Sequence, residues 1–336
     1  MRHSAVLAAV ILSACTLQRY SATEMSAADD HAAHMNAADL QAPVAPRTFD
    51  LSQQGQAGLP ASNNAAAARL AASPRHGEWV KFPSAPGSAD SIMAWIVYPE
   101  AREKAPVVVV VHEIFGLATW VRGVADQVAA DGFIAIAPDF LTRVRGGPST
   151  VELRGDTARA LIAGVNIEER NRIIAAAASY AMMQPAATQK YGVIGYCWGG
   201  STTFAHAVNG GVKGFSGGVA FYGAPFMAGG SPATATTAAV PASPVADSLA
   251  KIRTPIMLLN GSKDARIGAA MPAIDSIMKA QRKDYVGVNY EGAVHGFLRA
   301  QDDPRAQRDP AEEAANLAAT RDGWPRTIAF LRKNLK

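Results

Sequence analysis

Cysteine is scarce in this sequence, which holds only Cys15 and Cys197 among its 336 residues. Two thiols cannot form the dense disulfide framework that stabilises small secreted proteins. Blocks of Lys and Arg, and basic stripes interleaved with aromatic residues, are missing too. The formal net charge of +4 therefore predicts a mildly basic surface and no nucleic-acid partner. With 49% hydrophobic and 18% charged residues, the chain is long enough to bury a large globular core.

The N-terminus has the pattern of an export signal. Ala5–Leu12 is an apolar run, too short to span a bilayer as a helix. It leads into Leu12-Ser13-Ala14-Cys15, which resembles the bacterial lipobox, in which a cysteine thiol receives a diacylglyceryl group. We expect residues 1–15 to be a signal peptide and Cys15 the lipidation site of an exported, periplasmic protein. Thr16, in place of Asp, favours the outer membrane. A plain secretory signal and an unprocessed N-terminus are the alternatives.

Two stretches of biased composition flank or interrupt the part that we expect to fold. Residues 16–74 are rich in Ala, Ser, Gln and Asn without a sustained apolar period, which predicts a disordered tether. His31 and His34 form an H-x-x-H pair there, but no second ligand cluster follows, so a metal site is not predicted. Gly229–Ala250 is rich in Ala, Thr, Ser and Pro and predicts a surface insertion.

Residues 75–336 alternate between strand and helix patterns, which predicts one α/β domain. Short apolar runs separated by helix-length patterns indicate a mostly parallel sheet with helices on both faces. The predicted strands are Glu78–Phe82, Ser91–Tyr98, Val107–Val111, Phe133–Ala137, Tyr191–Ile194, Gly218–Tyr222, Ile256–Leu259 and Tyr285–Tyr290. The predicted helical regions are Leu117–Asp131, Asp156–Met183, Gly199–Val208, Ala269–Arg282 and Glu312–Leu331.

Cys197 lies in a pattern typical of a nucleophile. Gly195-Tyr196-Cys197-Trp198-Gly199 follows a predicted strand and opens a predicted helix. This is the setting of the nucleophile elbow, where small residues relieve crowding in a strained turn and the nucleophile projects from the sheet edge. The helix start also favours a thiolate through its dipole. A buried structural cysteine is the alternative.

An acid and a histidine follow Cys197 in the chain order of α/β-hydrolases. Asp264 comes just after the predicted strand Ile256–Leu259, and His295 lies in a glycine-flanked loop after Tyr285–Tyr290. The carboxyl ends of parallel strands meet at one edge of a sheet. We therefore expect Asp264 to orient His295, and His295 to act as the base for Cys197.

From residue 78 to 334 the sequence resembles the dienelactone hydrolase family, and this resemblance implies the α/β-hydrolase fold. It includes the elbow, the acid, Ala137-Pro138-Asp139 and the stretch Val111-His112-Glu113-Ile114-Phe115-Gly116-Leu117. In that family the Glu after the third core strand pairs with the resting Cys thiol and helps to generate thiolate, a role that the resemblance gives to Glu113. The alternative is an acid that only pairs with a helix dipole. Trp198 departs from the family and could reshape the acyl pocket.

The same resemblance implies arginines that bind a substrate carboxylate. Arg299, a few residues after His295, fits one of these positions. The second position stays open among Arg143, Arg154 and Arg159. A surface charge is the alternative for Arg299.

The sequence thus predicts a hydrolase that cleaves a small-molecule carboxylic ester or lactone through an acyl-Cys intermediate. The backbone N–H groups of Ile114 and Trp198 would hold the oxyanion. The mechanism needs no metal or organic cofactor, and the membrane enters only through the lipid anchor. The alternatives are a thioesterase or aryl esterase, and a lipid-tethered, non-catalytic binding protein or thiol sensor on the same fold.

Overall fold

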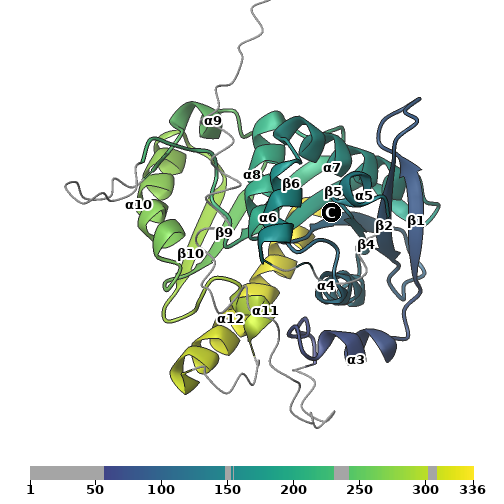
Figure 1. Ribbon diagram of the computed structural model, residues 1–336, viewed down its shortest axis with the longest axis horizontal. Coiled ribbons are helices and arrows are strands. Elements are labelled where there is room, and N and C mark those ends of the chain that lie inside the picture. Colours follow the sequence, from purple (N-terminus) through teal and green to yellow (C-terminus); the bar gives the residue numbers. More distant parts are fainter. Residues whose placement is uncertain (1–56, 148–152, 154, 231–241, 302–308) are drawn as a thin grey trace, which may run out of the picture.

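The structure is a computed structural model that describes residues 57–147, 153, 155–230, 242–301 and 309–336. In this part of the chain, one sheet of eight strands forms the centre of the molecule (Figure 1), in the order β1-β2-β4-β3-β5-β6-β9-β10. These strands are β1 Gly77–Pro83, β2 Ser91–Val97, β3 Ala105–Val111, β4 Ile134–Pro138, β5 Ala187–Tyr196, β6 Phe215–Phe221, β9 Ile256–Gly261 and β10 Tyr285–Tyr290.

The sheet is parallel from β4 to β10 and antiparallel at its other edge. β2 pairs antiparallel with both β1 and β4, while β3 pairs parallel with β4 and β5. The branched side chains of Val107–Val111 are all fully buried, because β3 lies in the middle of the sheet with helices on both faces. The predicted mostly parallel α/β sheet is confirmed.

Helices cover both faces of the sheet, as two neighbouring glycines of β6 show. A side chain at Gly217 would point at Phe330, whereas one at Gly218 would point at Thr203. Successive strand residues face opposite ways, so the helices that carry Phe330 and Thr203 lie on opposite faces. The helices are α3 Ala66–Ala71, α4 Thr119–Ala130, α5 Thr142–Arg145, α6 Gly155–Ala163, α7 Ile167–Met182, α8 Trp198–Asn209, α9 Ala246–Ala250, α10 Ala265–Ala280, α11 Phe297–Ala300 and α12 Pro310–Leu335.

The predicted strands all form, with ends shifted by a few residues, but the predicted helical region Asp156–Met183 is wrong as a single unit. It divides into α6 and α7 at residues 164–166. The Asn166 side chain accepts a hydrogen bond from the backbone N–H of Glu169 at 2.9 Å, which caps a new helix. The capping asparagine, preceded by Gly164, is the physical reason for the break.

The predicted tether is wrong for residues 57–74, which pack on the domain. Ala65 and Ala66 are buried, and α3 lies against α4. The Trp120 indole N–H donates to the carbonyl of Ala61 at 3.1 Å, which fixes the segment over the start of α4. Helix formation here depends on these tertiary contacts, because a six-residue alanine-rich helix has little stability by itself.

Several predictions from the sequence fall on residues outside the described ranges. Cys15 with its lipobox, the His31/His34 pair and Arg154 are among them, so lipidation and export stay predictions. The predicted insertion Gly229–Ala250 is described only in part. At its end, Ser243–Pro244 forms β8, which pairs with β7 at Met227–Ala228, and α9 buries Leu249. Over the described residues, every helix is too short or too polar to cross a membrane.

The attachment of the 57–75 segment makes a prediction about stability. Arg75 binds Asp126 of α4 through two hydrogen bonds of 3.0 and 2.6 Å, and both side chains are largely buried. Asp126→Asn should lower the free energy of unfolding by about 1–3 kcal/mol, because it removes the charge of the carboxylate that makes both hydrogen bonds and leaves the buried guanidinium only the more distant, exposed Glu100 at 3.8 Å. Urea denaturation measures the change.

A matched control breaks an ion pair that is more exposed. Lys263 lies 3.2 Å from Glu312, and Lys263→Ala should cost less than about 1 kcal/mol. Equal small losses in both variants would show that the 57–75 segment contributes nothing to the fold.

Candidate functional site

Cys197 occupies a strained turn between β5 and α8. Its backbone angles are φ 56° and ψ −117°, although a residue with a Cβ rarely adopts a positive φ. The turn is held on both sides, since the N–H of Cys197 donates to Phe221 and its carbonyl accepts from Gly200. Backbone strain of this kind is found where the surrounding structure holds a reactive side chain in place. The predicted nucleophile-elbow geometry is present.

Two glycines allow the turn to form. A side chain at Gly195 would meet the carbonyl oxygen of Gly199 at 1.9 Å, and one at Gly199 would meet the carbonyl oxygen of Val111 at 2.4 Å. Backbone atoms cannot move aside as a flexible side chain can. The elbow therefore needs glycine at both positions, which is the physical reason for the G-x-C-x-G pattern.

Asp264 and His295 meet at the same edge of the sheet. Asp264 is the N-cap of α10 after β9, and His295 lies in the loop after β10. The Nδ1 of His295 is 2.6 Å from Oδ2 of Asp264, and both residues are buried. The hydrogen bond points Nε2 of His295 away from the carboxylate, and this Nε2 is buried without a well-formed hydrogen bond. The predicted Asp–His pairing is present.

The charges of the three residues reinforce one another. Burial alone would lower the pKa of His295, but the negative charges of Cys197 and Asp264 raise it well above its ordinary value. Burial alone would raise the pKa of Asp264, yet His295 holds it below its usual value. A hydrogen bond with Cys197 also contributes to the raised pKa of His295, although its geometry is not that of a well-formed bond. Such contacts commonly tighten only when substrate binds.

Glu113 and Arg299 lie at the same site and interact with each other. Glu113 follows β3 and is buried, and its Oε2 is 3.4 Å from Nε of Arg299 on α11. The Arg299 guanidinium also lies over the Phe115 ring at 4.9 Å. Only 13% of the Arg299 side chain is exposed, so it is not an ordinary surface charge. Arg299 thus lies beside Glu113, the acid that the family resemblance pairs with the Cys197 thiol.

His112 is a buried residue of the site that the sequence reasoning passed over. The N–H of Phe140 donates to its Nε2 at 3.1 Å, so the proton of the ring lies on Nδ1. That Nδ1–H donates to the carbonyl of Glu113 at 2.5 Å, and the ring stacks on Trp198 at 5.9 Å. Burial lowers the pKa of His112, although the nearby charge of Asp139 acts in the opposite direction. The lowered pKa keeps the ring neutral. In the sequence, the only sign of this role was the position of His112 directly between a predicted buried strand and Glu113.

Tyr222 is a second residue that the sequence reasoning missed. It follows β6 with φ 39°, and its ring centroid lies 5.0 Å from that of His295. Its hydroxyl is buried without a hydrogen-bond partner in the described part of the chain. Burial, with the charges of Glu113 and Cys197, raises the pKa of Tyr222 well above its ordinary value, so the hydroxyl remains a neutral donor.

The second carboxylate-binding arginine stays unassigned. Arg143 is half exposed and pairs with Glu169 at 2.6 Å, and Arg159 lies on α6. Arg170, which the sequence reasoning did not consider, places its guanidinium 4.6 Å from the Trp198 ring. Burial lowers the pKa of Arg170 to about 10. Arg170 therefore packs against Trp198, which is the residue after Cys197.

Chemically, the site brings together a thiol, an imidazole and a carboxylate that is hydrogen-bonded to the imidazole. This combination suits acyl transfer. Within the described ranges, no group of three or more His, Cys, Asp or Glu residues is arranged to hold a metal ion. The sheet, the elbow and the order of these residues define an α/β-hydrolase fold.

Comparison with known proteins gives the family. The model of the dienelactone hydrolase family matches residues 92–335. A Methylorubrum extorquens protein with the provisional name carboxymethylenebutenolidase is 30% identical over 259 residues, covering 76% of this chain and 80% of the relative. A Bradyrhizobium protein, provisionally named 2-oxo-3-(5-oxofuran-2-ylidene)propanoate lactonase, is 26% identical over 77% of this chain and 94% of its own.

A solved structure has the same fold. A Klebsiella pneumoniae protein, provisionally named dienelactone hydrolase, superposes with a TM-score of 0.58 at 24% identity, covering 76% of this chain and 99% of its own. This chain belongs to the dienelactone hydrolase family, as its sequence predicts, and the family supports a hydrolase of the lactone or ester type.

The crowding at the elbow predicts the effect of one added methyl group. Gly199→Ala should destabilise the fold by about 3 kcal/mol or more, because its Cβ would meet the backbone of β3. Gly147→Ala is the matched control, since a Cβ there meets nothing within 4 Å. Thermal and urea unfolding of both variants measure the difference. A Gly199→Ala variant as stable as the control would contradict the tight elbow.

Proposed function

We propose that this protein hydrolyses a carboxylic ester or lactone through Cys197 as nucleophile, His295 as base and Asp264 as the residue that orients His295. The observation that carries the proposal is the position of Cys197 on a strained turn, within reach of the charge of a His295–Asp264 pair. A structural cysteine would not require a strained backbone or a raised histidine pKa beside it.

The reaction runs in two steps. His295 takes the proton of the Cys197 thiol and becomes an imidazolium. The resulting thiolate attacks the carbonyl carbon, a C–S bond forms, and the electron pair of the C=O bond moves onto oxygen. The tetrahedral intermediate collapses, the C–O bond breaks, and the His295 imidazolium gives its proton to the leaving alkoxide. His295 then takes a proton from water, which attacks the thioester, and the acid leaves as Cys197 is regenerated.

The oxyanion is held in this proposal by the N–H groups of Ile114 and Trp198. Trp198 is the first residue of α8, so its N–H has no acceptor within the helix. The Ile114 N–H belongs to the same peptide group as the Glu113 carbonyl, and the two point in opposite directions in a trans peptide. The His112 bond to that carbonyl therefore aims the Ile114 N–H the other way and makes it a stronger donor.

Glu113 and Arg299 supply the selectivity in this proposal. Their ion pair is buried, so a substrate carboxylate that binds Arg299 would displace Glu113 from it. The freed carboxylate would then help His295 to generate the Cys197 thiolate, as the family resemblance implies. The relative named as a propanoate lactonase has such a carboxylate in its named substrate. We therefore propose a lactone that carries a carboxylate as the preferred substrate.

The role of Cys197 predicts the outcome of its removal. Cys197→Ala should abolish hydrolysis of p-nitrophenyl acetate, by about 10⁴-fold or more in kcat, while circular dichroism and Tm stay near those of the wild type. Intact-protein mass spectrometry after an activated ester should show one acyl adduct on Cys197. Wild-type turnover in the Ala variant would exclude the cysteine mechanism and favour a binding or sensing role.

The role of His112 predicts different losses in two variants of similar size. His112→Asn keeps a donor near Nδ1, whereas His112→Gln keeps an acceptor near Nε2. If His112 orients the Ile114 N–H, kcat should fall about tenfold to a hundredfold further in Gln than in Asn with KM little changed. Alkylation of Cys197 by iodoacetamide, which forms no oxyanion, is the control and should proceed equally in both. Equal kcat in the two variants would show that His112 contributes only packing and does not orient the Ile114 N–H.

The role of Arg299 predicts a loss that depends on substrate charge. Arg299→Ala should lower kcat/KM for a carboxylate-bearing lactone by about 1.5–3 kcal/mol, the contribution of a charge-assisted hydrogen bond. A neutral lactone of the same skeleton should react nearly as before. Arg326→Ala, which removes a partly exposed arginine of α12, is the control. Equal losses on both substrates would make Arg299 a support for the loop and for Glu113.

A further inference from the structure

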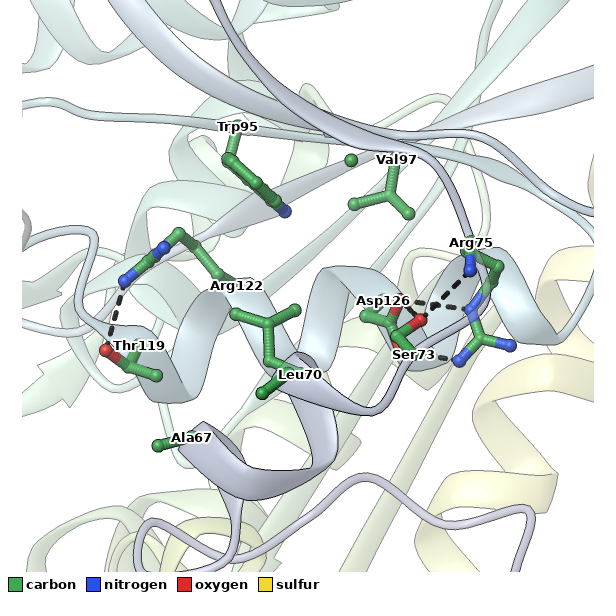
Figure 2. Close-up of a pocket in the computed structure, with 11 residues that line it drawn as sticks. Ala67, Leu70, Ser73, Arg75, Trp95, Val97, Thr119, Arg122 and Asp126 are labelled. Carbon is green, nitrogen blue, oxygen red and sulfur yellow. Dashed lines mark hydrogen bonds and ion pairs between the residues drawn. The ribbon is translucent and has the colours of Figure 1, made fainter.

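A cavity separate from Cys197 lies between α3, β2 and α4. Its volume is about 390 Å³, at the lower end of the range of small-molecule sites. Figure 2 shows Leu70 on one side, Trp95 and Val97 on the other, and Thr119, Arg122 and Asp126 along α4. Neither the triad residues nor Glu113 or Arg299 line it. One wall comes from residues 67–77, which precede the part of the chain that the family model matches.

Arg122 is the unusual residue of this cavity. Its guanidinium lies 5.5 Å from the ring centroids of both Trp79 and Trp95, which hold it in one place. One nitrogen donates to Oγ1 of Thr119 at 3.1 Å, and the Nε–H is buried without a partner in the described part of the chain. A guanidinium has five N–H donors, and the contact with Thr119 uses one of them.

No carboxylate of the described residues neutralises Arg122. Asp126, the one acid that lines the cavity, already accepts hydrogen bonds from Ser73 at 2.6 Å and from Arg75 at 3.0 and 2.6 Å. Two arginines and one aspartate therefore line the space, which leaves one positive charge in excess. Burial lowers the pKa of Arg122, and no nearby charge offsets the effect. A partly buried cation without a counter-ion is unfavourable, and an anionic ligand relieves this cost.

The remaining walls suit an apolar body. Leu70, Ala67 and Ala71 come from α3, and Val97 comes from β2. The indole N–H of Trp95 is buried without a partner in the described residues, and Figure 2 shows it toward the space that the labelled residues enclose. A small rotation of Trp95 or Arg122 would bring these N–H groups to an acceptor in the cavity. The site thus offers charge and hydrogen-bond donors at one end and hydrocarbon along the rest.

We propose that this cavity binds a small organic acid, with its anionic group on Arg122 and Trp95 and its apolar part against Leu70 and Val97. The anionic group is a carboxylate or a phosphonate-like group, both of which match the guanidinium fork. The two tryptophan rings keep the Arg122 guanidinium beside the cavity before the ligand arrives, so binding requires only a small rotation of Arg122 or Trp95. This proposal does not depend on the role of Cys197.

The test is a titration followed by the indole N–H signals in NMR spectra. The probes are phenylacetate, phenylphosphonate and the neutral phenylacetamide. The signal that disappears in Trp95→Phe identifies Trp95 among the five tryptophans. Both anions, or the one that fits, should shift the Trp95 signal with Kd in the millimolar range or tighter, and phenylacetamide should bind about tenfold or more weakly.

Variants then separate this cavity from the site around Cys197. Arg122→Gln should weaken phenylacetate binding about tenfold or more, and Arg122→Lys should recover part of the loss. Trp95→Phe keeps an aromatic ring, and the indole N–H signal of Trp79, whose ring centroid lies 5.6 Å from that of Trp95, reports binding to this variant. The affinity should fall about twofold to tenfold, which decides the matter if Arg122→Gln does not fold. Arg299→Ala and Cys197→Ala should bind phenylacetate as the wild type does.

Other outcomes overturn the proposal. These are no Trp95 shift at about 10 mM of either anion, equal binding of phenylacetamide, or unchanged affinity in the variants of Arg122 and Trp95. Loss of binding in Arg299→Ala alone would place the acid at the other site. A failure here leaves hydrolysis by Cys197 untouched, because that is measured by acylation of the thiol.

Discussion

The close approach of the elbow to the end of β3 is the constraint on which the rest of the site depends. At Gly199 no room exists for even a methyl group, because the carbonyl of Val111 lies where a Cβ would be. This contact fixes the start of α8 against the loop that carries Glu113 and Ile114. Cys197 takes a positive φ as a consequence, and the sheet around it holds the strain.

Around that contact, hydrogen bonds between buried polar groups fix the orientation of side chains and backbone groups, which apolar packing alone would not do. His112 ties the carbonyl of Glu113 to the N–H of Phe140, so loops after two neighbouring strands are held together. In the same way, the hydrogen bond between Asp264 and His295 holds together the loops after the neighbouring strands β9 and β10. These side chains are buried, and in such surroundings a satisfied hydrogen bond is strong and an unsatisfied one is costly. The bonds therefore hold His112 and His295 in defined orientations.

The N-terminal segment shows how a weak local signal becomes structure. Residues 57–75 have few large apolar side chains, yet a handful of contacts to α4 hold them: the Trp120 indole, the Arg75–Asp126 pair and the buried alanines of α3. The same packing encloses a cavity lined by Arg122, which has no counter-ion among the residues that the structure describes. An isolated segment of this composition would stay unfolded, because its helix is too short to stabilise itself.

The sequence by itself determined the parallel sheet, the positions of its strands and the elbow around Cys197. Short buried runs, glycines and chain order are local patterns, and the backbone chemistry that they reflect is local too. The packing of residues 57–75, the pairing of Glu113 with Arg299 and the place of His112 and Tyr222 came only from the tertiary structure. Each of these depends on which distant side chains and backbone groups the fold brings together, and no local pattern encodes that.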